Sequence, residues 1–123
     1  RGMAGLAEHV VSNQQLAPHL QHNPYAVKEY RDRMARNNVV GYCSGMLALS
    51  RMRDRTGDLG NIKVPTLIIV GDLDIPFIAP SKLMHERIAG SKLVVIPGAG
   101  HMANIERPFE FDTAVVSFLD ALA

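Results

Sequence analysis

Two residues whose side chains could share a proton follow two apolar segments in the C-terminal half of the chain. Asp74 follows the segment 64–70, and His101 follows the segment 92–96. A carboxylate that accepts the proton on one imidazole nitrogen fixes the tautomer of the ring. The other ring nitrogen can then take a proton from a nucleophile. These two residue types, each after its own segment, predict an acid and a base that act together.

Each of these residues also has a purely structural interpretation. A lone aspartate after a strand is more often a turn or cap residue, and Asp72 competes with Asp74 for the role of the acid. A lone histidine among glycines, such as His101, carries little more information. The pair, with each member directly after a separate apolar segment, is what favours a catalytic interpretation.

The apolar segments that precede these residues predict buried strands of a parallel sheet. Segment 64–70 reads VPTLIIV and ends at Gly71, and segment 92–96 reads KLVVI and is followed by Pro97. Helices are predicted from Pro80 and from Pro108, so the order is strand, helix, strand, helix. Such units build an α/β sheet with right-handed crossovers, and its strands end at the edge where ligands bind.

The first half of the chain has the spacing of helices. Met3 begins one apolar helical face, and Asn23 is a predicted N-cap with Pro24 at the first position of a second helix. A third helix is predicted from about Val39 to Arg53, and the second and third helices are predicted to be amphipathic. The character of the sequence changes near residue 60, which predicts a helical segment at 1–57 ahead of an α/β segment at 58–123.

Two motifs in the second half resemble a known family. Residues 64–74, VPTLIIVGDLD, resemble the strand that delivers the triad acid in α/β-hydrolases, a pattern that selects Asp74. Residues 94–108, VVIPGAGHMANIERP, are similar to the histidine loop and the start of the last helix of that family. More weakly, residues 1–57 resemble the helical cap of 3-oxoadipate enol-lactonases and their esterase and haloperoxidase-like relatives. The resemblance implies the C-terminal part of an α/β-hydrolase core, preceded by a cap segment.

The resemblance also implies a function. In the family the order is nucleophile, acid and histidine, and the nucleophilic serine sits in a Gly-x-Ser-x-Gly elbow. No such motif occurs in the chain. We therefore expect part of a serine hydrolase that acts on ester or lactone-like acyl substrates without a cofactor, whose nucleophile and oxyanion hole precede residue 1. The alternative is an interaction module, derived from a hydrolase, that has no catalytic activity.

A second alternative is a complete small cysteine hydrolase. Residues 41–45, GYCSG, have the Gly-x-Cys-x-Gly form of the elbow in dienelactone hydrolases, and the order Cys43, Asp74, His101 is the family's order. An elbow needs a buried strand before it, however, and only Val39 and Val40 are available. The plainer interpretation of Cys43 is a small packing residue on a cap helix.

Composition excludes several classes of function. There are 13 lysines and arginines against 12 acids, which gives no reason to expect a nucleic acid or an anionic membrane as partner. No apolar run approaches the length of a membrane helix. Cys43 is the only cysteine, which suits a reducing compartment such as the cytoplasm. His19 and His22 have no third ligand nearby, so no metal site is predicted.

Two further expectations concern the acids of the last helix and the partners of the chain. Glu106 and Glu110 are expected to complement the dipole of that helix. Two parallel strands make a poor sheet, because one edge and both faces expose apolar groups. We therefore expect a partner, either the missing N-terminal half or a second copy of the chain.

Overall fold

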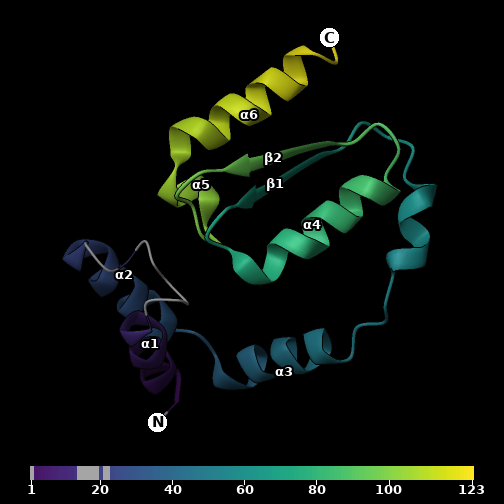
Figure 1. Cartoon of the computed structure of the whole chain (residues 1–123). Coiled ribbons are helices and arrows are strands. Elements are labelled where there is room, and N and C mark those ends of the chain that lie inside the picture. The colour runs from purple at the N-terminus through teal and green to yellow at the C-terminus, as the bar shows by residue number, and fades with distance from the viewer. Residues whose placement is uncertain (1, 14–19, 21–22) are drawn as a thin grey trace. The chain divides into compact units, whose positions relative to one another are not determined.

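The computed structural model of the chain describes residues 2–13, 20 and 23–123 (Figure 1). The chain divides into two compact units, one that runs up to Arg53 and one that begins at Asp54. The predicted boundary between residues 57 and 58 is close to this division. That the first unit serves as a cap stays a prediction.

In the first unit, helix α1 (Gly2–Ser12) packs against helix α2 (Pro24–Ala35). Helix α2 begins as predicted, since the Asn23 side chain accepts a hydrogen bond from the Ala26 amide at 3.1 Å and Pro24 opens the first turn. The Arg31 guanidinium joins the two helices through both carboxylate oxygens of Glu8, at 2.6 and 2.8 Å. The small core beneath this pair is apolar and consists of Val11 and Leu20 with Val10, Ala26, Val27 and Tyr30 packed around them.

Helix α3 (Val39–Ser50) completes the first unit and confirms the third predicted helix. It begins after Asn38, whose side chain accepts a hydrogen bond from the Gly41 amide at 2.9 Å. The helix buries no side chain, so the apolar face predicted for it is not packed against another element. Its large exposed apolar residues are Val39, Val40, Met46, Leu47 and Leu49.

The second unit is built on two parallel strands, β1 (Leu67–Gly71) and β2 (Lys92–Ile96). Their register pairs Leu67 with Lys92 and Gly71 with Ile96, so both strands end at the same edge. The predicted parallel α/β arrangement is confirmed, and β2 has the predicted bounds. Strand β1 starts three residues later than the predicted 64–70. The expected burial on both faces is only partial, since Ile68, Val70 and Ile96 are buried but Val95 is 43% exposed.

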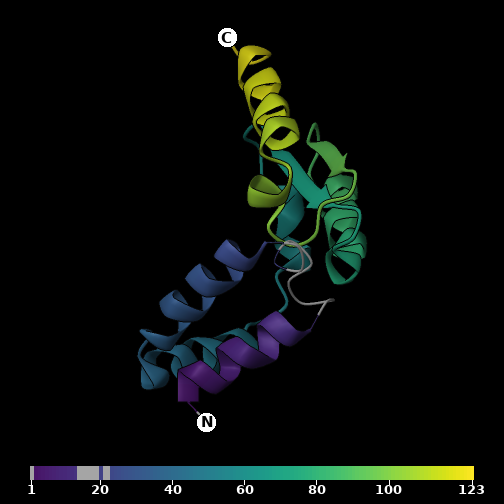
Figure 2. The same ribbon diagram turned by 90° about the vertical axis from the view of Figure 1, so that its left-hand side faces the viewer.

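Helices flank these strands in the second unit, and Figure 1 shows the strands between α4 (Ile75–Arg87) and α6 (Pro108–Asp120). The 3-10 helix η2 (Thr56–Asn61) precedes β1, and the short helix α5 (Ala103–Glu106) joins β2 to α6 (Figure 2). The core of this unit lies where β2 enters α5 and consists of Ile96, Ala99 and Ala103, packed against Ile69, Val94 and Phe111.

The start of α4 corrects one prediction. The helix was predicted to open at Pro80, but it begins five residues earlier, at Ile75, with Pro76 in its first turn and Pro80 inside. Either proline can occupy a first turn, where its missing N–H costs nothing. The sequence of this segment therefore did not distinguish the two starts. The earlier start brings the first turn of the helix directly after Asp74.

Candidate active site

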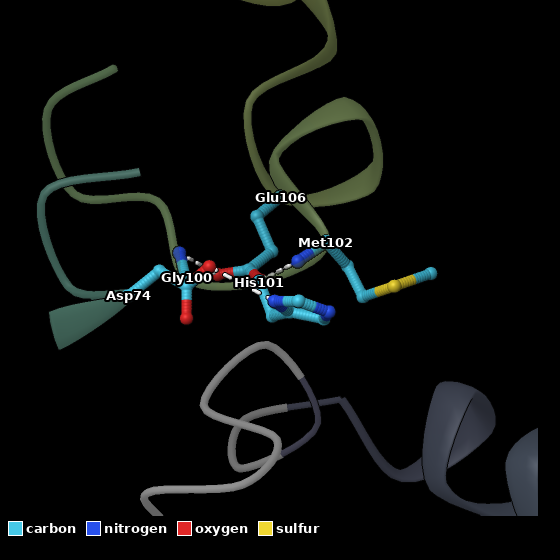
Figure 3. A network of polar contacts seen from close by, with 5 residues as sticks. All are labelled: Asp74, Gly100, His101, Met102 and Glu106. Carbon is cyan, nitrogen blue, oxygen red and sulfur yellow. Dashed lines mark hydrogen bonds and ion pairs between the residues drawn. The ribbon is translucent and has the colours of Figure 1, made fainter. Parts of the chain in front are cut away.

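Asp74 and His101 meet at the edge where both strands end. Nδ1 of His101 lies 2.9 Å from Oδ2 of Asp74. Figure 3 shows the two side chains turned toward each other. The Asp74 side chain is 12% exposed, whereas the His101 side chain is 59% exposed. The carboxylate is therefore sheltered while the ring remains accessible to a reacting group. The contact expected from the sequence is present, and the catalytic role of the pair stays a prediction.

Asp72, which competes with Asp74 in the sequence, has different partners. Its carboxylate oxygen Oδ1 accepts a hydrogen bond from the Gly98 amide at 2.7 Å, and its own amide donates to the Ile96 carbonyl at 3.1 Å. Asp72 thus ties the loop after β1 to the loop after β2. The geometry leaves Asp74 as the aspartate that contacts the imidazole.

The two loops approach each other so closely that Gly71 has no room for a side chain. A Cβ atom added at Gly71 would lie 2.1 Å from the Ala99 carbonyl oxygen and 2.6 Å from the Gly100 carbonyl oxygen. The Leu73 amide donates to the same Ala99 carbonyl at 2.9 Å. Gly98 has a φ of 67°, a conformation that glycine adopts without steric cost. Main-chain packing therefore fixes the separation of the acid loop and the histidine loop.

Phe77 packs beside the imidazole, and the sequence reasoning missed it. Its ring centroid lies 4.7 Å from that of His101, with 43° between the ring planes. The Phe77 amide donates to the Asp74 carbonyl at 2.9 Å, so one helical turn positions both side chains. The sequence does place an aromatic residue three positions after Asp74. With α4 predicted to begin at Pro80, Phe77 fell outside the helix, and its position one turn after the acid could not be recognised.

Glu106 was the second residue missed. Its oxygen Oε2 accepts a hydrogen bond from the Gly100 amide at 2.8 Å, and Oε1 accepts one from the Met102 amide at 3.1 Å. Figure 3 shows this carboxylate beside the backbone on both sides of His101. The expectation that Glu106 serves the dipole of the last helix is therefore incomplete, because the side chain turns back to the histidine loop. Glu110 does lie in the first turn of α6, as expected.

The cysteine alternative places its candidate nucleophile in the other unit. Cys43 is exposed and lies inside helix α3, and so do Gly41 and Gly45 on either side of it. The element before α3 is helix α2, which ends at Ala35, and not the buried strand that an elbow requires. We therefore do not include Cys43 in the proposed chemistry.

The described part of the chain offers neither a metal site nor a membrane-spanning helix. Within residues 2–13, 20 and 23–123, no group of three histidine, cysteine, aspartate or glutamate side chains is arranged to hold a metal ion. His19 and His22, considered as ligands from the sequence, lie outside these residues. In the same ranges, no helix has both the length and the apolar character needed to cross a membrane.

Comparisons with known proteins reveal relatives in sequence and in structure, although no protein-family model matches the chain. Over 67 residues the chain is 42% identical to the proline iminopeptidase of Lactobacillus helveticus, which covers 53% of this chain and 22% of the relative. The crystal structure of the enol-lactonase from Burkholderia xenovorans aligns with a TM-score of 0.82 at 30% identity and covers 96% of this chain and 45% of that one.

A third comparison concerns the fold alone. The structure of MenH from S. aureus aligns with a TM-score of 0.88 at 24% identity and covers 98% of this chain and 46% of that one. The chain thus spans less than half the length of the proteins that it matches. These proteins are members of one superfamily, the α/β-hydrolases, which confirms the resemblance inferred from the sequence.

Proposed function

We propose that this chain, which has the C-terminal part of an α/β-hydrolase fold, supplies the acid and the histidine of a catalytic triad that hydrolyses ester or lactone bonds. Asp74 would be the acid and His101 the general base. The single observation that carries the proposal is the distance of 2.9 Å between His101 Nδ1 and Asp74 Oδ2 at the edge where β1 and β2 end.

In the proposed reaction, the contact with Asp74 holds the proton of the His101 ring on Nδ1 and leaves Nε2 as the base. Nε2 takes the proton of a serine hydroxyl, and the serine oxygen attacks the acyl carbon of the substrate. His101 then returns that proton to the leaving alkoxide, and the carbon–oxygen bond of the ester breaks. A water molecule then gives a proton to the same nitrogen and attacks the acyl carbon, the bond from that carbon to the serine oxygen breaks, and His101 returns the proton to the serine oxygen as the carboxylic acid leaves. Asp74 stabilises the imidazolium in both steps.

The serine and the oxyanion-hole donors of the proposed enzyme would come from polypeptide outside these 123 residues. This is supported by the lack of a Gly-x-Ser-x-Gly motif in the sequence and by the coverage of 45% of the enol-lactonase. The supplier of the nucleophile would be an N-terminal half. A second copy of the chain would cover only the open sheet edge, because it has the same sequence and therefore no serine elbow. We place the enzyme in the cytoplasm, because a single cysteine suits a reducing compartment.

The proposed substrate class is supported by two of the matched structures. One matched structure is an enol-lactonase and another is described as an enzyme that degrades N-acyl homoserine lactones, so both act on lactones.

The test uses the coding sequence upstream of Arg1. The longest open reading frame that contains this chain is expressed, and hydrolysis of p-nitrophenyl acetate and of a simple enol-lactone is measured for it and for this chain alone. We expect hydrolysis by the longer polypeptide and loss of it in His101→Ala, with none by the chain alone. Glu110→Gln serves as the matched surface control.

Three outcomes would overturn the proposal. Hydrolysis that survives His101→Ala in the longer polypeptide would remove the histidine from the mechanism. Hydrolysis by the chain alone would mean that the nucleophile lies within these residues. A longer reading frame that lacks a serine elbow would instead favour the non-catalytic interaction module.

A further inference from the structure

One carboxylate holds the main chain on both sides of His101. The Gly100 amide precedes the histidine and the Met102 amide follows it, and both donate to the carboxylate of Glu106, at 2.8 and 3.1 Å respectively. The backbone of Glu106 is bonded to the same loop, because its amide donates to the Met102 carbonyl at 2.9 Å. Glu106 is the last residue of α5, so this short helix and the histidine loop form one hydrogen-bonded ring (Figure 3).

We propose that Glu106 is a positioning residue, which sets the backbone of residues 100–102 so that the imidazole of His101 faces Asp74. The inference rests on the proposed function, because the aim of the ring matters for the reaction only if His101 is the base. Glu106 acts through the main chain of its neighbours and is assigned no contact with the substrate.

A carboxylate suits this position better than any other side chain of its size. An ionised carboxylate is an acceptor at both oxygens, whereas the amide of glutamine has one acceptor oxygen and one donor nitrogen. Two backbone amides therefore find two acceptors in Glu106 and only one in glutamine. Hydrogen bonds to a charged acceptor are also shorter and stronger than neutral ones.

The part of the histidine loop before Gly100 is hydrogen-bonded to the loop after β1. The Ala99 carbonyl accepts from the Leu73 amide at 2.9 Å, and the Gly98 amide donates to Asp72 at 2.7 Å. These bonds fix the loop before Gly100 to the loop after β1. From Gly100 to Met102, the stretch that includes His101, the backbone is hydrogen-bonded to Glu106 instead. The Glu106 side chain thus holds the part of the backbone whose rotation would move the His101 ring away from Asp74.

The first experiment measures the loop in this chain without any substrate. Amide hydrogen exchange at Gly100 and Met102, and the proton resonance of His101 Nδ1–H, are followed by NMR in wild type, E106Q, E106A and E110Q. We expect slow exchange at both amides in wild type, faster exchange at one of the two in E106Q and at both in E106A. The Nδ1–H resonance should weaken in the same order, and E110Q should resemble wild type.

The second experiment measures catalysis in the longer polypeptide that hydrolyses the ester. E106A should lower kcat by up to about 100-fold with little change in KM, as expected when a catalytic group is displaced but the binding surface is kept. E106Q should fall between E106A and wild type because it retains one acceptor. E110Q should keep the wild-type kcat, and circular dichroism checks that each variant is folded.

The outcomes separate this inference from the proposed function. If hydrolysis depends on His101 but E106A and E106Q keep the wild-type kcat and the wild-type exchange at Gly100 and Met102, Glu106 does not position the loop. If hydrolysis is independent of His101, the proposed function fails, while the exchange data still decide whether Glu106 orders the loop. A loss of folding in E106A leaves E106Q, which has the same size and shape, to decide the question.

Discussion

At the scale of the residue, the two aspartates after β1 have separate tasks. Asp72 accepts a hydrogen bond from a backbone amide of the histidine loop, whereas Asp74 contacts the imidazole of His101 itself. An asparagine can accept a bond from an amide as an aspartate does. It cannot stabilise an imidazolium with a negative charge. The same substitution should therefore have unequal effects at the two positions.

We expect Asp74→Asn to lower kcat for ester hydrolysis in the longer polypeptide by on the order of 10³- to 10⁴-fold, through loss of the correct tautomer and of the charge. Asp72→Asn, the matched variant, should cost no more than about tenfold, because its Oδ1 can still accept from Gly98. The measurement is kcat and KM at saturating ester. Equal losses in the two variants would contradict the assignment of Asp74 as the acid.

The sequence predicts some members of the site better than others. Asp74 and His101 could be found because each follows an apolar strand in a recognisable motif. Phe77 could not, because the first turn of α4 was not predicted, and Glu106 could not, because nothing in a linear sequence shows that a side chain turns back toward an earlier loop.

At the scale of the element, the loops after the two strands depend on a missing side chain. The backbone of Ala99 and Gly100 occupies the space that a Cβ on Gly71 would need. Backbone atoms cannot rotate away as the end of a flexible side chain can. A methyl group at this position must therefore displace the histidine loop or the end of β1.

We expect Gly71→Ala to lower the free energy of unfolding by about 1–3 kcal/mol, the usual cost of overpacking. Gly60→Ala is the control in the same unit, since its added Cβ would meet only the Arg87 carbonyl oxygen at 4.0 Å. Urea unfolding, followed by circular dichroism, measures both variants. A Gly71→Ala variant as stable as Gly60→Ala would show that the two loops are free to separate.

Helix α4 carries a second element-scale prediction, because Pro80 lies in its interior and is exposed. A proline there lacks the N–H that would donate to the carbonyl of Pro76, one turn earlier. We expect Pro80→Ala to raise the free energy of unfolding by about 1–2 kcal/mol, after allowance for the greater freedom of the unfolded chain. Thermal unfolding checks this.

The matched control for that variant is Pro76→Ala. Pro76 is also exposed and lies in the first turn of α4, where no hydrogen bond is lost to a proline. We expect this variant to be neutral or slightly less stable than wild type. If both alanine variants changed the unfolding temperature equally, the effect would belong to the unfolded chain and not to the helix.

The elements themselves were predicted to different degrees, for physical reasons. The ends of some elements are marked in the sequence. Pro97 directly follows strand β2, and a proline occupies the first position of helices α2 and α6. The four-residue helix α5 is too short for its pattern to be distinguished from a loop. Helix α3 was found by its spacing, but its lack of buried side chains depends on tertiary contacts that spacing does not report.

At the scale of the whole molecule, the second unit leaves much apolar surface exposed. Its sheet has two strands, and α6 buries no side chain, with Phe109 79% exposed and Val116 and Leu119 more than half exposed. Monomeric proteins rarely expose large contiguous apolar surface, and open strand edges pair readily with other strands. We therefore expect the isolated chain to associate with itself or with another polypeptide.

We expect static light scattering to give a mass above the 13.5 kDa of a single chain, at the concentrations used for structural work. Addition of the separately expressed upstream region should replace this self-association with a defined one-to-one complex. The V116K/L119K double variant should reduce self-association through α6. A stable monomer that does not bind the upstream region would argue against a need for any partner.

The absence of a side chain at position 71 also restricts how the histidine loop of this chain can be engineered. A designer who grafts this histidine-bearing turn, residues 97–101, into another hydrolase imports a stretch of backbone shaped to lie against a bare α-carbon. In a recipient with a larger residue at the matching strand end, the Cβ of that residue would meet the grafted backbone, as it would here at Gly71. Pairs of donor and recipient enzymes should therefore be chosen by that distant glycine before any similarity between the turns themselves is considered.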